Sequence, residues 1–162
     1  MRNWTWLGQF VHEECQRNGS TICVANTHLN ALGSPGHRLE QIKVLLNALS
    51  NNSDDIQILA GDLNTTPDSI ELVYLFSQGW SDAAVKAVER VVEPTWSNQN
   101  ALTKGWLRSS SARLDFVLYK LKDSQQCPYV PEKYTTVMKG ATSARRVLID
   151  AMYLDVLWTF VE

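Results

Sequence analysis

Apolar and polar positions follow two different periods along the chain, and the two periods predict strands interspersed with helices. Residues 56–60 form a short apolar run that is typical of a strand buried on both faces. Residues 113–119 form a second run of this kind. Residues 38–49 and 68–77 instead space their apolar side chains as one face of a helix does. Strands separated by helices predict an α/β domain built in layers around a mixed sheet.

The first part of the chain predicts a hairpin. Residues 6–14 and 21–27 have the composition of paired strands, and Asn18-Gly19 between them is a strong hairpin-turn signal. Gly33, Pro35 and Gly36 predict a loop over residues 31–36. Further along, we expect loops over residues 94–111 and 120–131 and an edge strand over residues 134–138.

The last apolar run, residues 147–161, is too short to span a membrane, and two acidic residues within it oppose burial in lipid. Its pattern predicts a helix from Val147 to about Asp155. The alternative is a strand over residues 154–161 that pairs with the edge of the sheet. In either form we expect the run to pack over the sheet, to support stability or self-association, and to supply no catalytic group.

Composition predicts a single globular domain. The chain has 162 residues, of which 44% are hydrophobic and 20% charged. A net charge of −2 argues against strong non-specific attraction to nucleic acid. The three cysteines show no CxxC spacing, so we expect reduced thiols and no zinc site. No signal peptide or transmembrane segment is visible, and we therefore expect an intracellular, cytoplasmic protein.

Polar side chains lie at or near the ends of three of the predicted strands, where a functional site is expected. Asn26 and His28 end the first, Asp62 and Asn64 end the second, and Asp115 lies in the third. Because Asp62 and Asn64 are two residues apart, their side chains would lie on the same side of an extended backbone. Carboxylate and amide oxygens suit a divalent cation beside a phosphate group. The alternatives are a turn rich in Asp and Asn, a histidine satisfied by the backbone, and an aspartate that caps a turn.

Three segments carry a family resemblance. They are NTHL at residues 26–29, GDLN at 61–64 and RLDFVLY at 113–119, with Arg38 and Gln41 on the helix between the first two. In this order they resemble signature segments of the endonuclease/exonuclease/phosphatase superfamily, over residues 10–120. The resemblance implies part of a four-layer, DNase-like α/β sandwich with a mixed, mainly antiparallel sheet. It also implies hydrolysis of phosphate esters that depends on Mg²⁺ or Mn²⁺.

The resemblance further implies roles for individual residues. Asp62 matches a carboxylate that activates water near the metal, and Asn64 an amide that binds phosphate. Asp115 matches a carboxylate that holds a histidine near the end of the family domain. The substrate would be a nucleic acid, a phospholipid headgroup or a phosphorylated small molecule. The implied site comprises catalytic His28, Asp62, Asn64 and Asp115, substrate-binding Asn26, Asn64 and Arg113, and metal-binding Asp62 and Asn64.

Two elements of the family pattern have no counterpart in the sequence. The upstream metal-binding glutamate is not matched by Glu13 or Glu14, and the final histidine has no match among His12, His28 and His37. We therefore expect residues 1–162 to form one incomplete domain with an atypical tail at 141–162, weak metal binding and impaired hydrolysis. The alternative is an inactive binding or dimerising module. A sheet face left exposed in such a domain would favour self-association.

Overall fold

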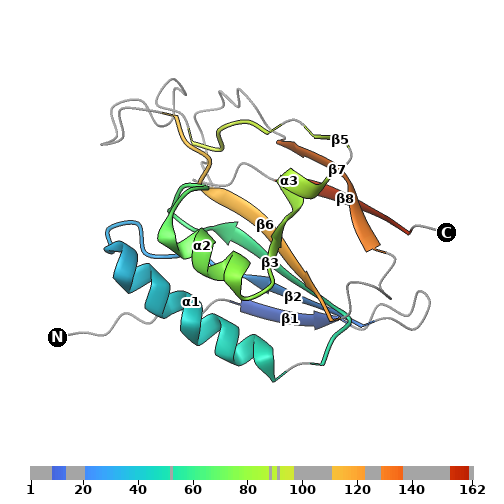
Figure 1. The fold of residues 1–162 in the computed structure, drawn as a ribbon, viewed down its shortest axis with the longest axis horizontal. Coiled ribbons are helices and arrows are strands. Elements are labelled where there is room, and N and C mark those ends of the chain that lie inside the picture. The colour runs from blue at the N-terminus through green and yellow to red at the C-terminus, as the bar shows by residue number, and fades with distance from the viewer. Residues whose placement is uncertain are drawn as a thin grey trace, which may run out of the picture.

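The computed structural model describes residues 9–13, 21–51, 53–87, 89–90, 92–96, 111–122, 129–136 and 154–160. Its centre is a five-stranded sheet in the order β1-β2-β3-β6-β4 (Figure 1). The parallel pair is β2–β3, and the other neighbours are antiparallel. This arrangement confirms the predicted mixed, mainly antiparallel sheet. The strands are β1 (Gln9–Glu13), β2 (Ile22–Asn26), β3 (Ile56–Asp62), β4 (Ser81–Asp82) and β6 (Asp115–Leu121).

Each face of this sheet packs against a different layer. Helices α1 (Pro35–Ser50) and α2 (Ile70–Ser77) cover one face, where Phe116 and Leu118 of β6 join their core cluster. On the other face Val117 and Tyr119 pack with α3 (Ala83–Lys86) and with a second sheet. Strand β6 is therefore buried on both sides, as its continuous apolar run predicts. The second sheet has the order β5-β7-β8 and comprises β5 (Glu89–Arg90), β7 (Tyr129–Thr136) and β8 (Leu154–Phe160).

Both long helices begin at a serine that caps them. The side chain of Ser34 accepts a hydrogen bond from His37 N, and Pro35 begins α1. The predicted loop over residues 31–36 is thus wrong at residues 35–36, which belong to α1. Proline suits the first helical position, because the N–H of a residue there would have no partner within the helix. Ser69 caps α2 by accepting from Leu72 N. Pro67 lies in the turn before α2.

The C-terminal strands differ most from the expectation. Strand β7 begins at Tyr129, so residues 129–131 are not loop, and it ends at Thr136. It pairs with both β5 and β8, so the predicted edge strand is a central strand of the second sheet. Strand β8 pairs antiparallel with β7, so the predicted helix is wrong at residues 154–155 and the alternative strand is confirmed there. The cause is tertiary, since β7 provides partners for the backbone of β8. Residues 147–153 and Asn18-Gly19 lie outside the described residues. None of the described helices is both long and apolar enough to cross a membrane.

Candidate active site

The ends of three strands meet at one end of the five-stranded sheet. Strands β2 and β3 run parallel and finish there, at Asn26 and Asp62. Strand β6 runs the opposite way and starts there at Asp115, the register partner of Asp62. Side chains that are directly opposite in an antiparallel pair lie on the same face. We call this end the site edge, and it consists of Asn26, His28, Asp62, Asn64 and Asp115.

Backbone hydrogen bonds continue from β3 onto the chain that leaves β2. Thr27 N donates to Ala60 O at 3.0 Å, and Leu29 N donates to Asp62 O at 2.9 Å. His28 therefore lies beside the end of β3, with its Nε2 3.6 Å from Asp62 Oδ2. The side chain of His28 is 56% exposed and that of Asp62 17%. The pair is thus open to a ligand from solvent.

Gly61 allows the two strands to approach this closely. Its φ of +132° lies in a region that other residues rarely adopt. A Cβ at this position would lie 1.9 Å from Thr27 O and 2.8 Å from Asn26 Oδ1. The missing side chain therefore lets the Asn26 amide lie over the backbone just before Asp62. Steric contact with Thr27 O therefore explains why the first residue of the GDLN segment is glycine.

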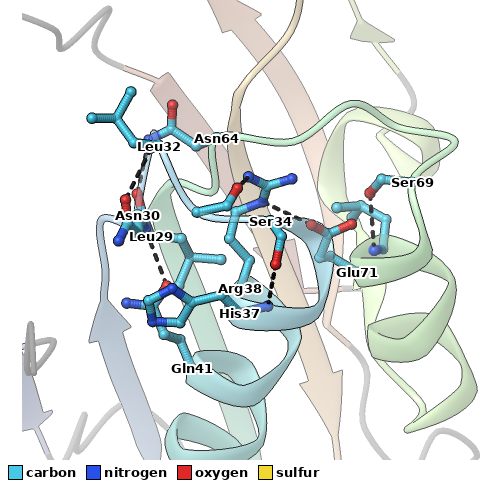
Figure 2. Close-up of polar contacts among 12 residues, drawn as sticks. Leu29, Asn30, Leu32, Ser34, His37, Arg38, Gln41, Asn64, Ser69 and Glu71 are labelled. Atoms are coloured by element: carbon cyan, nitrogen blue, oxygen red, sulfur yellow. Dashed lines mark hydrogen bonds and ion pairs between the residues drawn. The ribbon is translucent and has the colours of Figure 1, made fainter.

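Asn64 is held in a defined orientation by its neighbours. Its φ is 48°, its N–H donates to Asp62 Oδ1 at 2.7 Å, and its side chain is buried. Its Nδ2 donates to Leu29 O at 2.8 Å (Figure 2). Because a carbonyl only accepts, the nitrogen must face Leu29, and Oδ1 faces away from it. Asp62 therefore shapes the turn that presents Asn64.

Thr95 anchors the start of β6, although the sequence analysis did not single it out. Its buried Oγ1 accepts from Leu114 N at 2.9 Å and from Asp115 N at 3.0 Å. Leu114 O in turn accepts from Leu63 N at 2.9 Å. Asp115 is thus held by a segment that is distant in sequence. The polar stretch around Thr95 predicts only a loop, and no local pattern marks this contact.

Arg113 does not join the site edge. Its guanidinium forms a buried ion pair with Asp82 and lies over the ring of Phe116, 4.3 Å from the centroid. Asp82 also accepts from Ala84 N at 2.9 Å and so caps α3. The Arg113 side chain, for which substrate contact was predicted, is thus buried and paired, and it supports the strand that carries Asp115.

Tyr134 of β7 packs in the same buried region. Its side chain is 1% exposed, and its hydroxyl has no hydrogen-bond partner among the described residues. Burial raises the pKa of Tyr134 to about 12, with Arg113 opposing the shift and Asp82 and Asp115 adding to it. The second sheet therefore contributes a neutral phenol behind the site edge.

The site edge has part of the donor set of a magnesium site. Asp62 and Asp115 lie opposite each other, and carboxylates in this position repel unless a cation offsets their charge. Mg²⁺ commonly takes one or two carboxylates and keeps several waters. However, no group of three His, Cys, Asp or Glu side chains in the described residues is arranged to hold a metal ion. The oxygen donors of the site edge that a cation could contact are thus Asp62, Asp115 and the Asn64 amide.

Comparison with known proteins agrees with these observations. The model of the Endonuclease/Exonuclease/phosphatase family matches residues 5–132. The mannosyl-6-phosphatase of Bacteroides thetaiotaomicron has a similar fold, with 19% identity, a TM-score of 0.67 and coverage of 93% of this chain and 56% of its own. The human Nocturnin catalytic domain with bound sulfate has 19% identity, a TM-score of 0.61, and coverage of 94% and 52% respectively.

A third solved structure is D. rerio TDP2 complexed with a single-strand DNA product. It has 19% identity and a TM-score of 0.59, and the match covers 80% of this chain and 54% of that one. At this level of identity the three structures support the fold. The chain spans about half the length of these matched structures. No curated protein matches the sequence significantly.

Proposed function

Because the chain belongs to the endonuclease/exonuclease/phosphatase family, we propose that the site edge takes part in hydrolysis of phosphate esters. The observation that carries this proposal is the meeting of Asp62 and Asp115 as register partners at one end of the sheet. His28 and Asn64 lie beside them, and both contact Asp62. Acidic, amide and imidazole groups at one exposed edge suit attack by water on a phosphate ester.

The contacts of each side chain suggest its role. Asp62 Oδ1 is engaged by Asn64 N, and its Oδ2 faces His28, so Asp62 can orient the water and take its proton. His28 is half exposed and can donate to a phosphate oxygen. The second N–H of Asn64 Nδ2 can donate to the same phosphate, because the first donates to Leu29 O and so orients the amide. As water adds to phosphorus and passes its proton to Asp62, the ester P–O bond breaks, and the leaving oxygen takes a proton from solvent to form the alcohol.

We propose that Mg²⁺ or Mn²⁺ binds through Asp62 and Asn64, with Asp115 nearby. When bound, the cation supplies positive charge that offsets the charge of the phosphate and of the carboxylates. The described residues contribute few donors, so binding would be weak. Slow hydrolysis by this chain would follow, because little of the protein would carry the cation at ordinary concentrations.

The substrate is proposed only as a phosphate ester. The proteins with a similar fold include a sugar phosphatase and a protein complexed with DNA, so they support no narrower choice. A nucleic acid, a phospholipid headgroup and a phosphorylated small molecule all carry the group that the site edge would bind. A panel of monoester and diester substrates is therefore needed.

The test measures hydrolysis of p-nitrophenyl phosphate and bis(p-nitrophenyl) phosphate with Mg²⁺, with Mn²⁺ and with a chelator. We expect metal-dependent turnover that Asp62→Asn lowers about 100-fold or more in kcat/KM, since this variant removes the charge and keeps the shape. Glu40→Gln is the matched control, because Glu40 is an exposed carboxylate on α1. Turnover that persists unchanged in Asp62→Asn would contradict the proposal.

A second candidate is a binding module that keeps the scaffold of the family. The absence of a three-ligand acidic, His or Cys group in the described part of the chain favours it. In this case the protein would bind a nucleotide or a lipid headgroup and hydrolyse neither diester nor monoester. Isothermal titration alongside the hydrolysis assay separates the two candidates. Metal-dependent hydrolysis that Asp62→Asn abolishes would exclude the binding module.

A further inference from the structure

Two loops carry the groups of the site edge, and each loop leads into a helix. Residues 27–34 leave β2, carry His28 and enter α1. Residues 63–69 leave β3, carry Asn64 and enter α2. Figure 2 shows Arg38 and Gln41 of α1 and Glu71 of α2 beside the residues of the first loop. We call these three side chains the loop clamp.

We propose that the loop clamp consists of positioning residues that hold His28 and Asn64 in place at the site edge. The inference rests on the proposed function for its catalytic consequence, but its structural content can be tested separately. The clamp residues do not belong to the site edge and act through the backbone of the first loop.

Arg38 connects the second helix with the first loop. Its Nε donates to Glu71 Oε1 at 2.7 Å, and its Nη1 donates to Gly33 O at 2.6 Å. The side chain of Arg38 is 11% exposed and that of Glu71 1%. The planar guanidinium reaches both acceptors at once, whereas the single ammonium of a lysine is less suited to this geometry.

Gln41 fixes the other end of the same loop. Its Oε1 accepts from Asn30 N at 3.1 Å. Asn30 then organises the turn, because its Oδ1 accepts from Leu32 N at 2.9 Å and its backbone carbonyl accepts from Gly33 N at 3.3 Å. The loop is therefore held at Asn30 by Gln41 and at Gly33 by Arg38.

Leu29 connects this held loop to the reacting groups. It lies between His28 and Asn30, its N–H donates to Asp62 O at 2.9 Å, and its carbonyl accepts from Asn64 Nδ2 at 2.8 Å. A shift of the loop would therefore move His28 and release the Asn64 amide together. A displacement of about 1 Å at a reacting group can lower a rate about 100-fold.

The ion pair of Arg38 and Glu71 is better explained by positioning than by stability. A buried ion pair can often be replaced by apolar side chains of similar volume without loss of stability. An apolar pair could still join α1 to α2, but it could not donate to Gly33 O. The distinctive contribution of Arg38 is thus its hold on the loop.

The experiment separates positioning from folding by means of paired variants. Gln41→Met removes the acceptor for Asn30 N, and Gln41→Glu keeps one. The double variant Arg38→Met with Glu71→Met replaces the buried ion pair by apolar side chains without leaving an unpaired charge. Lys43→Met is the control, because it removes an exposed ion pair with Glu40 from the same helix.

Two readouts are used for each variant. Amide hydrogen exchange by NMR reports on Leu29 N and Asn64 N, and turnover of bis(p-nitrophenyl) phosphate in Mg²⁺ reports kcat and KM. We expect Gln41→Met and the double variant to exchange faster at these two amides while the melting temperature stays near that of the unaltered protein. We also expect kcat to fall about 10- to 100-fold, with little change in Gln41→Glu and Lys43→Met.

The outcomes are distinguishable from failure of the proposed function. If the unaltered protein shows no turnover, that function fails, and faster exchange at Leu29 and Asn64 still supports positioning. Unchanged exchange at both amides in Gln41→Met and in the double variant would overturn the inference. Unchanged kcat in these variants, with normal turnover in the unaltered protein, would overturn its catalytic part.

Discussion

Gly61 is the residue at which β3 comes closest to the chain that leaves β2. Substitution by alanine would force a Cβ into Thr27 O and impose a φ of +132° on a residue with a side chain. We expect Gly61→Ala to lower the free energy of unfolding by roughly 3–5 kcal/mol. Urea denaturation measures this change.

Gly79 provides a matched control for this steric argument. Its φ is also positive, at +86°, but the nearest atom to an added Cβ is Lys120 Cε at 3.6 Å. Gly79→Ala should therefore carry only the backbone strain, about 1–2 kcal/mol. If Gly61→Ala were no more destabilising than Gly79→Ala, the close approach of Thr27 would not be what requires glycine.

Tyr134 makes stability depend on pH in the alkaline range. Its pKa is about 12 in the folded protein, mainly because of burial, against an ordinary value of 10.0. Below pH 10 the phenol is neutral in both states and stability is unaffected. Between pH 10 and 12 the unfolded chain loses its proton first, so about 2–3 kcal/mol of stability is lost.

We therefore expect Tyr134→Phe to weaken the loss of stability between pH 10 and 12. At pH 7 this variant should be close to neutral or slightly stabilising, because the described residues offer the buried hydroxyl no hydrogen-bond partner. Burial also raises the pKa of Tyr119, so part of the alkaline loss should remain. Urea midpoints at pH 8 to 12 give the comparison, and identical profiles for both proteins would contradict the prediction.

At the scale of elements, the start of β6 depends on a contact from the segment that contains Thr95. The hydroxyl satisfies the N–H groups of Leu114 and Asp115, and Leu114 is buried. Thr95→Val keeps the shape and removes the acceptor. We expect the free energy of unfolding to fall by about 1–3 kcal/mol for the unpaired N–H of Leu114, and by a similar or smaller amount for that of Asp115.

Thr95→Ser is the corresponding control, because it retains the hydroxyl. Its loss of stability should be clearly smaller than that of Thr95→Val, and hydrogen exchange at Asp115 N should stay slow. Equal stability of the two variants would show that the hydroxyl contacts do not anchor β6. The comparison thus tests the element that delivers Asp115 to the site edge.

At the scale of the whole molecule, the second sheet covers the face of the central sheet that the long helices leave uncovered. Strand β8 pairs along β7, and Tyr134 of β7 packs with Val117 and Tyr119 of β6. Removal of residues 147–162 would expose the edge of β7. An exposed strand edge promotes association with other chains.

We therefore expect deletion of residues 147–162 to lower the melting temperature by about 5–10 °C and to promote self-association. Thermal unfolding and light scattering coupled to size-exclusion chromatography measure the two effects. A truncated protein that remained monomeric with an unchanged melting temperature would show that this segment does not stabilise the fold. Turnover should be less affected than stability, since β8 contributes no residue to the site edge.

Local patterns were sufficient to predict much of the architecture. The apolar runs of β3 and β6 and the helical spacing in α1 and α2 report burial directly, because burial of each face requires apolar side chains at the matching period. The polar residues after β2 and β3 and at the start of β6 could be recognised as a candidate site because they interrupt or end apolar strands. A polar group in such a position needs a partner.

Other features depend on partners that are distant in the chain. The strand character of residues 154–160 comes from pairing with β7, and the apolar residues of this segment are equally compatible with a helix. The burial of Arg113 against Asp82 and the hold of Thr95 on Asp115 likewise join segments that no local period relates. Hydrogen bonds and ion pairs between distant segments leave no periodic signal.

The sequence alone therefore indicated the order of six elements and the polar residues at the ends of the central strands. These elements are β1, β2, α1, β3, α2 and β6. Only the structure revealed why glycine lies between Ala60 and Asp62, because the close contact comes from Thr27, which is distant in the chain. The tertiary structure decided which polar residues meet. Asp62 lies opposite Asp115, Arg113 pairs with Asp82, and Arg38 donates to Gly33 O. Strand register and packing between distant segments bring these groups together, and no local pattern specifies them.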